Sequence, residues 1–338
     1  MVFKYLLLAV FLVLFACTSK FNEAYKPFKK VLAQQAYTAI NDSIIAQPKN
    51  ANFYAERSAI ALKNDAEDLA WLDAKNAWFF MPNVGSANAV VNVISTSKYN
   101  KEFLPYAKNI VAILPTNTKL RRALQLVYFN NQNYGEALKQ NDTIFMQFKN
   151  NALPNIEYFL QDRGKLLLEI GDTAKAIFNF EQAIAIAPTN KAAVYELANI
   201  YATSGNPKTI TLCDAYIKND VENIEAEPYY FKAVYFSTIK NNNQALTLLQ
   251  QAITTSYNFI DAWLLKGEIY LNINKLDEAE AAYNKALTIS KINGDAWYGL
   301  GQIAEIRNDK QNAYLFYGRA ASFDIENEEA KAGMERNK

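Results

Sequence analysis

The sequence predicts an all-α fold built from repeated helical hairpins, and three observations support this prediction. The tripeptide Asp-Ala-Trp occurs at residues 261–263 and again 34 residues later, at 295–297. The residues that follow it recur with the same spacing, in the pairs Gly267/Gly301, Tyr283/Tyr317 and Ala286/Ala320. Turn and stop residues recur as well, with Gly171 and Gly205 in mid-unit and Pro188 near a unit's end. Self-similarity at a fixed period of roughly 20–50 residues is typical of stacked repeat architectures.

The repeated unit has an aromatic residue at position 4, small residues at positions 8, 20 and 27, an aromatic at 24 and proline near 32. This pattern and its 34-residue period resemble the tetratricopeptide repeat family. The resemblance implies a right-handed α-solenoid of helix-turn-helix hairpins. It also implies that the first helix of each unit lines a concave surface.

The recurrent residues have packing roles. Two amphipathic helices must bury their apolar faces against each other and against the next unit. Small residues at the helix crossings let backbones approach, and aromatic side chains fill the space beside them. Glycine or asparagine near position 15 suits the left-handed conformation that ends a helix. We therefore expect Trp263, Trp297, Gly267 and Gly301 to be structural residues and not ligands of a bound molecule.

Residues 1–16 are predicted to be a signal peptide of the lipoprotein type. An apolar run follows Lys4, and it is shorter than the roughly 20 residues that a membrane-spanning helix needs. The run ends in the letters LFAC, which resemble the bacterial lipobox, although Phe15 stands where a small residue is usual. The resemblance implies cleavage before Cys17 and attachment of lipid to it. An ordinary signal peptide or an uncleaved anchor, with Cys17 incidental, is the alternative.

The mature chain is expected to begin with a short polar tether, residues 17–27. Residues 28–50 resemble a lone second helix and are predicted to form a partial repeat. Residues 51–151 are predicted to hold units 1–3, which begin at residues 51, 84 and 118. The last two of these units match the repeat pattern more weakly, with Phe103 where alanine is usual.

The stretch ALPNI at residues 152–156 interrupts the period, since Pro154 cannot continue a helix. Residues 157–327 are predicted to hold units 4–7, with Glu225 as a one-residue insertion. We count seven full units in all. Residues 328–338 are short and polar, which suits a cap over the exposed end of a repeat array.

The composition excludes several classes of function. The chain has no histidine, which excludes Ser-His-Asp and Cys-His catalysis and histidine-ligated zinc. Its two cysteines, Cys17 and Cys213, are too few for a zinc cluster or a disulfide framework, and we expect Cys213 to be a packed, inert thiol. The formal net charge of +1 predicts no nucleic-acid partner. We expect neither a metal nor a cofactor.

A partner groove is implied by the family resemblance, because partner peptides of the family usually lie against positions such as 5 and 9 of the first helices. Carried over to residues 191–306, these positions are Tyr195, Asn199, Tyr230, Leu264, Glu268, Tyr298 and Gln302. Tyrosine offers a large contact area at a low entropic cost, and amides can bind a peptide backbone. A solvated concave face without a dedicated ligand is the alternative.

These inferences predict a non-catalytic, lipid-anchored scaffold or adaptor that binds another protein or peptide of the bacterial cell envelope. Thr18 follows Cys17 in place of the aspartate that retains enterobacterial lipoproteins in the inner membrane. The outer membrane, on the side facing the periplasm, is therefore the expected location. Two alternatives stay open. One is a peptidoglycan- or glycan-binding module that uses exposed tyrosines, and the other is an enzyme with a site in the degenerate units, residues 84–156.

Overall fold

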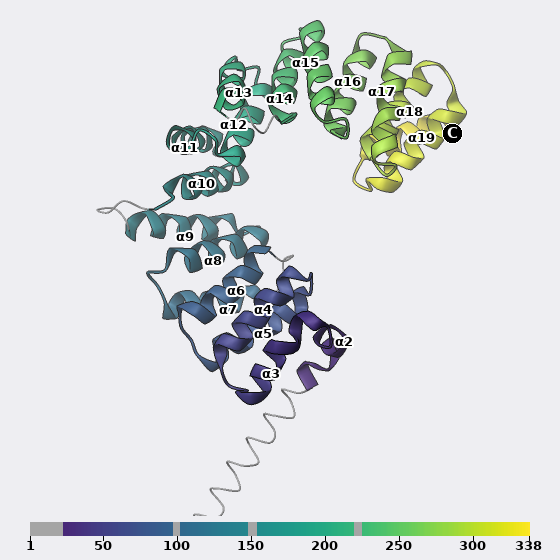
Figure 1. Ribbon diagram of the computed structural model, residues 1–338. Helices are drawn as coiled ribbons and strands as arrows, with labels where there is room; N and C mark the ends of the chain where they lie inside the picture. The colour runs from purple at the N-terminus through teal and green to yellow at the C-terminus, as the bar shows by residue number, and fades with distance from the viewer. Residues whose placement is uncertain (1–22, 97–101, 148–153, 220–224) are drawn as a thin grey trace, which may run out of the picture. The chain divides into compact units, whose positions relative to one another are not determined.

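The computed structural model describes residues 23–96, 102–147, 154–219 and 225–338. The described secondary structure consists of α-helices and two short 3-10 helices, without a strand (Figure 1). The expected all-α solenoid of helical hairpins is thereby confirmed. Among the described helices, none has both the length and the apolar character needed to cross a membrane. The predicted signal peptide, residues 1–16, and Cys17 lie outside the described residues.

The chain divides into two compact units. Unit 1 contains residues up to Pro154 together with Leu166–Gly171. Unit 2 contains Asn155–Lys165 together with Asp172–Lys338. Helix α10 (Ile156–Ile170) contributes residues to both.

Unit 1 consists of short N-terminal helices followed by three helix pairs. Its helices are η1 (Lys26–Phe28), α2 (Lys29–Leu32), η2 (Gln35–Tyr37), α3 (Thr38–Ala46), α4 (Ala51–Lys63), α5 (Glu67–Phe80), α6 (Val84–Thr96), α7 (Phe103–Ile113), α8 (Thr118–Asn130) and α9 (Tyr134–Gln147). One hydrophobic core runs through these pairs and includes Tyr54, Trp71 and Val90. Within residues 28–50, α3 takes the place of the expected lone helix, and the short helices that precede it were not predicted.

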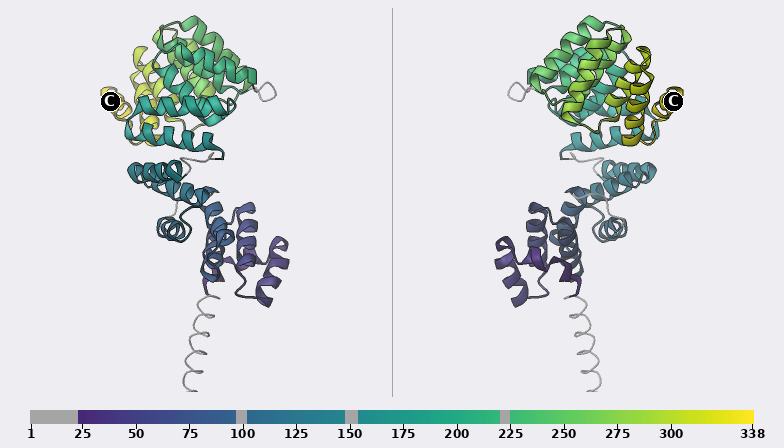
Figure 2. Two further views of the ribbon diagram at one scale, coloured as in Figure 1. Left: turned by 90° about the vertical axis from the view of Figure 1, so that its left-hand side faces the viewer. Right: turned by 90° about the vertical axis from the view of Figure 1, so that its right-hand side faces the viewer.

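Unit 2 consists of further helix pairs and a final single helix. Its helices after α10 are α11 (Thr173–Ile186), α12 (Lys191–Thr203), α13 (Lys208–Asn219), α14 (Glu227–Thr238), α15 (Asn242–Thr255), α16 (Ile260–Asn272), α17 (Leu276–Ile289), α18 (Gly294–Ile306), α19 (Lys310–Phe323) and α20 (Glu328–Arg336). The helices from α16 to α19, green to yellow in Figure 1 and Figure 2, pack side by side in sequence order. Helix α20 packs on α19, at the end where a cap was expected.

The number of full repeats needs correction. From α4 to α19 the described residues form eight successive helix pairs, whereas the sequence led us to count seven. The difference lies in residues 157–327, to which we assigned units 4–7. Five pairs occupy that range, from α10/α11 to α18/α19, because five periods of 34 residues fit within it.

In seven of the eight helix pairs the described turn uses a left-handed residue, as position 15 of the pattern predicts. Seven of the pairs place a residue with positive φ there: Asp65, Gln132, Gly171, Gly205, Lys240, Asn274 and Asn308. Glycine and asparagine adopt this conformation readily, whereas Lys240, at a φ of 63°, adopts it against its intrinsic preference. The repeat geometry therefore imposes the turn even where the residue type does not favour it.

Small residues at position 8 form slots that receive the aromatic side chain at position 24. A Cβ added to Gly267 would lie 2.7 Å from Cε1 of Tyr283, and one on Gly301 would lie 2.6 Å from Cδ1 of Tyr317. Real Cβ atoms do not approach other atoms so closely, so only glycine fits these positions without rearrangement. The expectation that both glycines are packing residues is confirmed.

Candidate functional site

The predicted partner-binding residues lie on the first helices of four successive pairs in unit 2. These helices are α12, α14, α16 and α18, and each contacts the next. We call the side of these helices that carries positions 5 and 9 the first-helix face. The structure therefore places Tyr195, Asn199, Tyr230, Leu264, Glu268, Tyr298 and Gln302 along one row of neighbouring helices.

Tyr195, the first residue of this row, is already engaged within the protein. Its hydroxyl donates a short hydrogen bond to Glu225, and its ring packs edge-on against Tyr216 and Phe231, at centroid distances of 5.9 and 5.4 Å. Burial and the hydrogen bond to Glu225 raise the pKa of Tyr195. A partner could contact part of the ring, but the hydroxyl already donates its hydrogen bond to Glu225.

Glu225 is a residue whose role sequence reasoning missed, since we treated it as a bare one-residue insertion. Its carboxylate accepts hydrogen bonds from Lys191 Nζ at 2.6 Å and from the Tyr216 hydroxyl at 3.2 Å, besides the one from Tyr195. These hydrogen bonds hold the pKa of Glu225 below its usual value, against the opposing effect of burial. The insertion therefore supplies the carboxylate that joins α12, α13 and the start of α14.

The apolar and aromatic members of the row are half-buried between repeats. Tyr230 packs edge-on against Phe259 at 5.2 Å, and Tyr298 packs against Tyr317 at 5.6 Å. Leu264 packs against the core between α16, α17 and α18. Burial, with a further contribution from nearby carboxylates, raises the pKa of Tyr230 to about 12. These side chains pack between the repeats and are only partly accessible to a partner.

The polar members of the row are more accessible. Asn199 and Glu268 are exposed and Gln302 is half-buried. Within the described residues, none of their side chains makes a hydrogen bond or an ion pair. Their capacity for hydrogen bonds is therefore available to a ligand or to water.

Two further carboxylates were not among the predicted residues: Asp261 lies on α16 two turns before Glu268 and on the same side of that helix, and Asp295 lies on α18. They occupy position 2 of adjacent repeats, in the first turns of α16 and α18. Partial desolvation and the charge of Asp295 raise the pKa of Asp261. We call Asp261, Glu268 and Asp295 the acidic cluster. Its signature in the sequence was the recurring Asp-Ala-Trp itself, whose aspartate we had assigned to packing.

The charges at the two ends of the first-helix face are paired. At one end Lys165 Nζ lies 3.2 Å from a carboxylate oxygen of Glu196. At the other end Glu305 accepts hydrogen bonds from Arg336, the Tyr317 hydroxyl and Asn337. These bonds lower the pKa of Glu305 to about 2, with Arg336 as the largest cause. The carboxylates Glu196 and Glu305 therefore both have a cationic partner.

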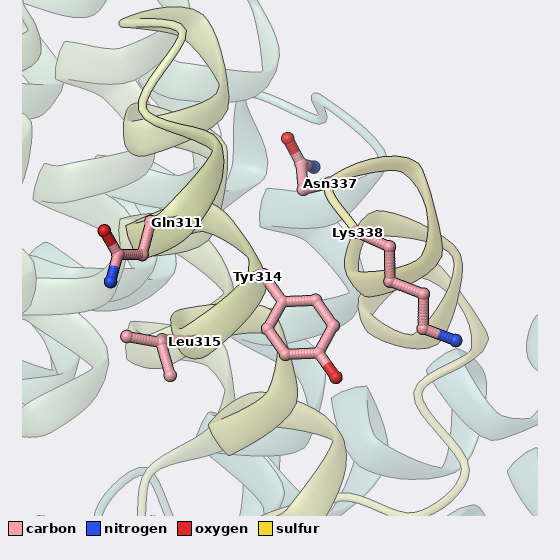
Figure 3. A pocket seen from close by; sticks show the side chains of 5 residues that line it. All are labelled: Gln311, Tyr314, Leu315, Asn337 and Lys338. Atoms are coloured by element: carbon pink, nitrogen blue, oxygen red, sulfur yellow. The ribbon is translucent and has the colours of Figure 1, made fainter.

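Two other candidate sites offer fewer groups that could bind a ligand or react with one. A shallow surface hollow near the last residues is lined by Gln311, Tyr314, Leu315, Asn337 and Lys338 (Figure 3). Its side chains come from the second helix α19 and the segment after α20, and the Lys338 ammonium there is bonded to Glu335. Cys213 is buried, and burial raises the pKa of its thiol to about 12, as expected of an inert cysteine.

Comparison with known proteins adds family and fold. Two sequence models of the tetratricopeptide repeat match residues 167–209 and 260–293. A crystal structure of a tetratricopeptide repeat protein from Parabacteroides merdae is similar with a TM-score of 0.56, at 16% identity, covering 85% of this chain and 98% of that one. The structure of PilW, a type IV pilus biogenesis factor, is similar with a TM-score of 0.53, at 15% identity, covering 63% and 96%. At such identities the likeness concerns the fold alone.

Among curated proteins, the human protein O-mannosyl-transferase TMTC1 is 24% identical over 165 residues, which is 48% of this chain. The matched region spans only 19% of that protein, so its name says nothing about the activity of this chain. Tetratricopeptide repeats are typical of protein-interaction scaffolds, and the fold is typically non-catalytic. The repeat models, the helix pairs and the structural likeness agree, and the chain is a tetratricopeptide repeat protein.

Proposed function

We propose that the protein is a non-catalytic scaffold or adaptor that binds another protein of the cell envelope through the first-helix face of unit 2. The observation that carries this proposal is the unsatisfied polar row on that face. Asn199, Glu268 and Gln302 offer free donors and acceptors beside half-buried tyrosine rings. Rigid aromatic edges next to adaptable polar groups suit recognition of an extended peptide.

A lipid on Cys17 would hold the scaffold at the membrane surface, in our proposal at the outer membrane on its periplasmic side. This part rests on the sequence of residues 1–17, where a short apolar run ends at a lone cysteine. A single acyl chain gives marginal anchorage, whereas two or three chains give stable anchorage. Intact mass spectrometry of protein purified from membranes tests it. A mature chain without acyl mass on Cys17 contradicts the anchor but leaves the scaffold proposal standing.

Site-specific photo-crosslinking in living cells tests the scaffold. We would place a photoreactive phenylalanine at Gln302, on the first-helix face, and as a matched control at Asn284, which is exposed on the second helix α17. We expect a discrete protein adduct from position 302 and none from position 284. Equal adducts from both positions, or none from either, contradict binding through this face. Retention of the chain on purified peptidoglycan sacculi without a protein adduct favours the glycan-binding alternative.

A further inference from the structure

The acidic cluster has no internal counter-charge. Asp261, Glu268 and Asp295 are all exposed, and within the described residues none of them forms an ion pair. Elsewhere on the face, Glu225 and Glu305 are paired with cations, and Glu227, at position 2 of α14, accepts a hydrogen bond from the Tyr195 hydroxyl at 3.4 Å. The middle of the face thus carries three negative charges that the protein itself does not neutralise.

The lysines of the same helices point away from the cluster. Lys232 and Lys266 both occupy position 7 of their repeats and reach back to the preceding second helix. Lys232 Nζ donates to Asp214 of α13 at 2.6 Å, and Lys266 Nζ donates to Gln250 of α15 at 3.1 Å. At about 100° per residue, Lys266 lies roughly 140–160° around α16 from Asp261 and Glu268. The repeat geometry therefore keeps these two lysines from forming ion pairs with the carboxylates of the acidic cluster.

The unpartnered hydroxyl of a largely buried tyrosine reaches the surface at the same place. Tyr283 is only 5% exposed, and its ring passes between Gly267 of α16 and Gly299 of α18. Its Cζ atom, which bears the hydroxyl, would lie 2.3 Å from a Cβ on Gly299. Gly299 lies four residues after Asp295 and hence on the same side of α18. On the α16 side the ring lies against Gly267, the residue before Glu268.

The hydroxyl of Tyr283 has no hydrogen-bond partner among the described residues, and it is not one of their fully buried polar atoms, so the oxygen reaches the surface. The equivalent residues of other repeats avoid this situation. Tyr317 donates to Glu305 at 2.6 Å, while the same position is Phe180 in one repeat and Leu249 in another, with no hydroxyl at all. The charges of Glu268 and Asp295 add to burial in raising the pKa of Tyr283, consistent with a hydroxyl close to both carboxylates.

Helix stabilisation and metal binding do not account for the arrangement. Asp261 and Asp295 lie in first helical turns, where a carboxylate interacts favourably with the helix dipole. Glu268 lies in the interior of α16, where that interaction is absent. In the described part of the chain, no group of three or more acidic or cysteine side chains is close enough to hold a metal ion. A compact inorganic cation is therefore a poorer fit than a longer organic one.

We propose that the acidic cluster, with the hydroxyl of Tyr283, receives lysine or arginine side chains of an extended partner segment. The proposal rests on the proposed function and gives its partner a chemistry, a basic peptide. The carboxylates would pair with the cations across a partly desolvated surface, where charge-assisted hydrogen bonds are strong. The edges of Tyr230 and Tyr298 would flank the segment.

Fluorescence anisotropy on the full chain, purified in detergent, tests this proposal. The probe is a labelled glycine-serine peptide with arginine at regular intervals, and its control replaces every arginine by the neutral isostere citrulline. We expect the arginine peptide to bind at least about tenfold more tightly than the citrulline peptide, with an affinity that falls as salt is added. Equal affinity for the two peptides overturns the proposal, and so does tighter binding of a glutamate version.

Two variants locate the binding site. Asp261→Asn/Glu268→Gln/Asp295→Asn should lower the affinity for the arginine peptide by about tenfold. A matched control, Glu278→Gln/Glu326→Gln/Glu329→Gln, removes the same charge from exposed positions of unit 2 outside the cluster and should change it less than about twofold. Equal losses in the two triple variants overturn the proposal, because they would show a non-specific field effect.

Tyr283→Phe removes only the unpartnered hydroxyl. We expect it to lower the affinity for the arginine peptide about fivefold while the thermal midpoint stays unchanged or rises. Unchanged affinity removes Tyr283 from the site. Self-association of the chain, if it is lost in the cluster variant, would identify a second copy as the occupant and also overturn the proposal.

The photo-crosslink from position 302 separates this inference from the proposed function. If the protein adduct persists in the cluster variant and the arginine peptide does not bind, the scaffold stands and the cationic partner is wrong. If the adduct is absent while the arginine peptide binds through the cluster, the cationic site stands and the envelope partner is wrong.

Discussion

In unit 1 the carboxylate of Asp73 is fully buried and bonded on both oxygens, whereas in unit 2 the carboxylates of the acidic cluster are exposed and unpaired. Arg57 donates to Asp73 from Nε and from Nη2, each at 2.8 Å, and the Tyr25 hydroxyl donates to Asp73 as well. Asn41 accepts a further hydrogen bond from Arg57 at 3.0 Å. This network ties the N-terminal segment and α3 to the α4/α5 pair, and its charges are balanced internally.

The difference separates structural charge from charge that is available for recognition. A buried ion pair is maintained because removing either partner leaves an uncompensated charge in a medium of low polarity. Exposed carboxylates such as Glu268 bear no such cost in water, and their presence adds little to stability. The charged side chains that serve recognition in this chain should therefore be those without a counter-charge inside the protein. The following predictions test this contrast, from the largest effect to the smallest.

Asp73→Asn should produce the largest loss of stability, about 3–5 kcal/mol, because it leaves the Arg57 guanidinium buried without a counter-charge. Hydrogen exchange followed by mass spectrometry should show faster exchange in α4 and α5, with α16–α19 unchanged. Asp68→Asn is the matched control, since Asp68 is exposed on the same helix and should cost less than about 1 kcal/mol. Equal effects of the two substitutions would show that the buried pair is not maintained as described.

Gly299→Ala should destabilise unit 2 by about 1–3 kcal/mol, because the new methyl group meets the rigid Tyr283 ring at 2.3–2.7 Å. Gly318→Ala is the control, since a Cβ there would meet only Met334 Sδ at an ordinary 3.5 Å. It should be neutral or stabilising by up to about 1 kcal/mol through helix propensity. Combining Gly299→Ala with Tyr283→Leu should restore stability, as read from thermal unfolding by circular dichroism. Failure of this rescue would mean that the ring is not the obstacle.

The repeat landmarks were predictable from the sequence because each reflects a constraint within one period. The ring of Tyr283 fills the space beside Gly267, sixteen residues earlier, and Asn274 forms the turn between the two helices. Both relations recur at a fixed spacing in the sequence and could therefore be predicted from it. The polar connections were not predictable in the same way. The hydrogen bond from Tyr195 to Glu225 joins residues 30 positions apart across an irregular insertion, and periodicity carries no information on such a pairing. The unpartnered hydroxyl of Tyr283 could not be predicted for another reason. The aromatic residue at position 24 recurs in Tyr317, but the carboxylate that accepts the hydrogen bond of Tyr317 has no counterpart for Tyr283.

Glu305 provides a pH-dependent test at the C-terminal end of unit 2. Its pKa is about 2 in the folded chain and about 4.3 when unfolded, so ionised Glu305 stabilises the fold above the unfolded value. This stabilisation should be lost as the pH falls from about 4.3 towards 2. Because Arg336 is largely exposed, solvent screening reduces the effect to about 1 kcal/mol. The protection factor of α20, which is its exchange rate relative to the intrinsic rate at the same pH, should fall over that range. In Glu305→Gln the protection should already be reduced at pH 5, and unchanged protection would contradict the role of the ion pair.

Glu268→Gln should have the smallest effect on stability, and its sign distinguishes the two kinds of carboxylate on the same face. Glu268 has no cation to lose and lies near two other negative charges, so its neutralisation should change the free energy of unfolding by less than about 0.5 kcal/mol, towards greater stability. The same change at Glu305 should cost about 1 kcal/mol. Chemical denaturation of the two variants provides the measurement, followed by tryptophan fluorescence, to which Trp263 and Trp297 of unit 2 contribute besides Trp71 and Trp78 of unit 1. If Glu268→Gln were destabilising by as much as Glu305→Gln, Glu268 would have a structural partner after all. A stable Glu268→Gln chain with weaker binding of the arginine peptide would show that this charge is kept for recognition.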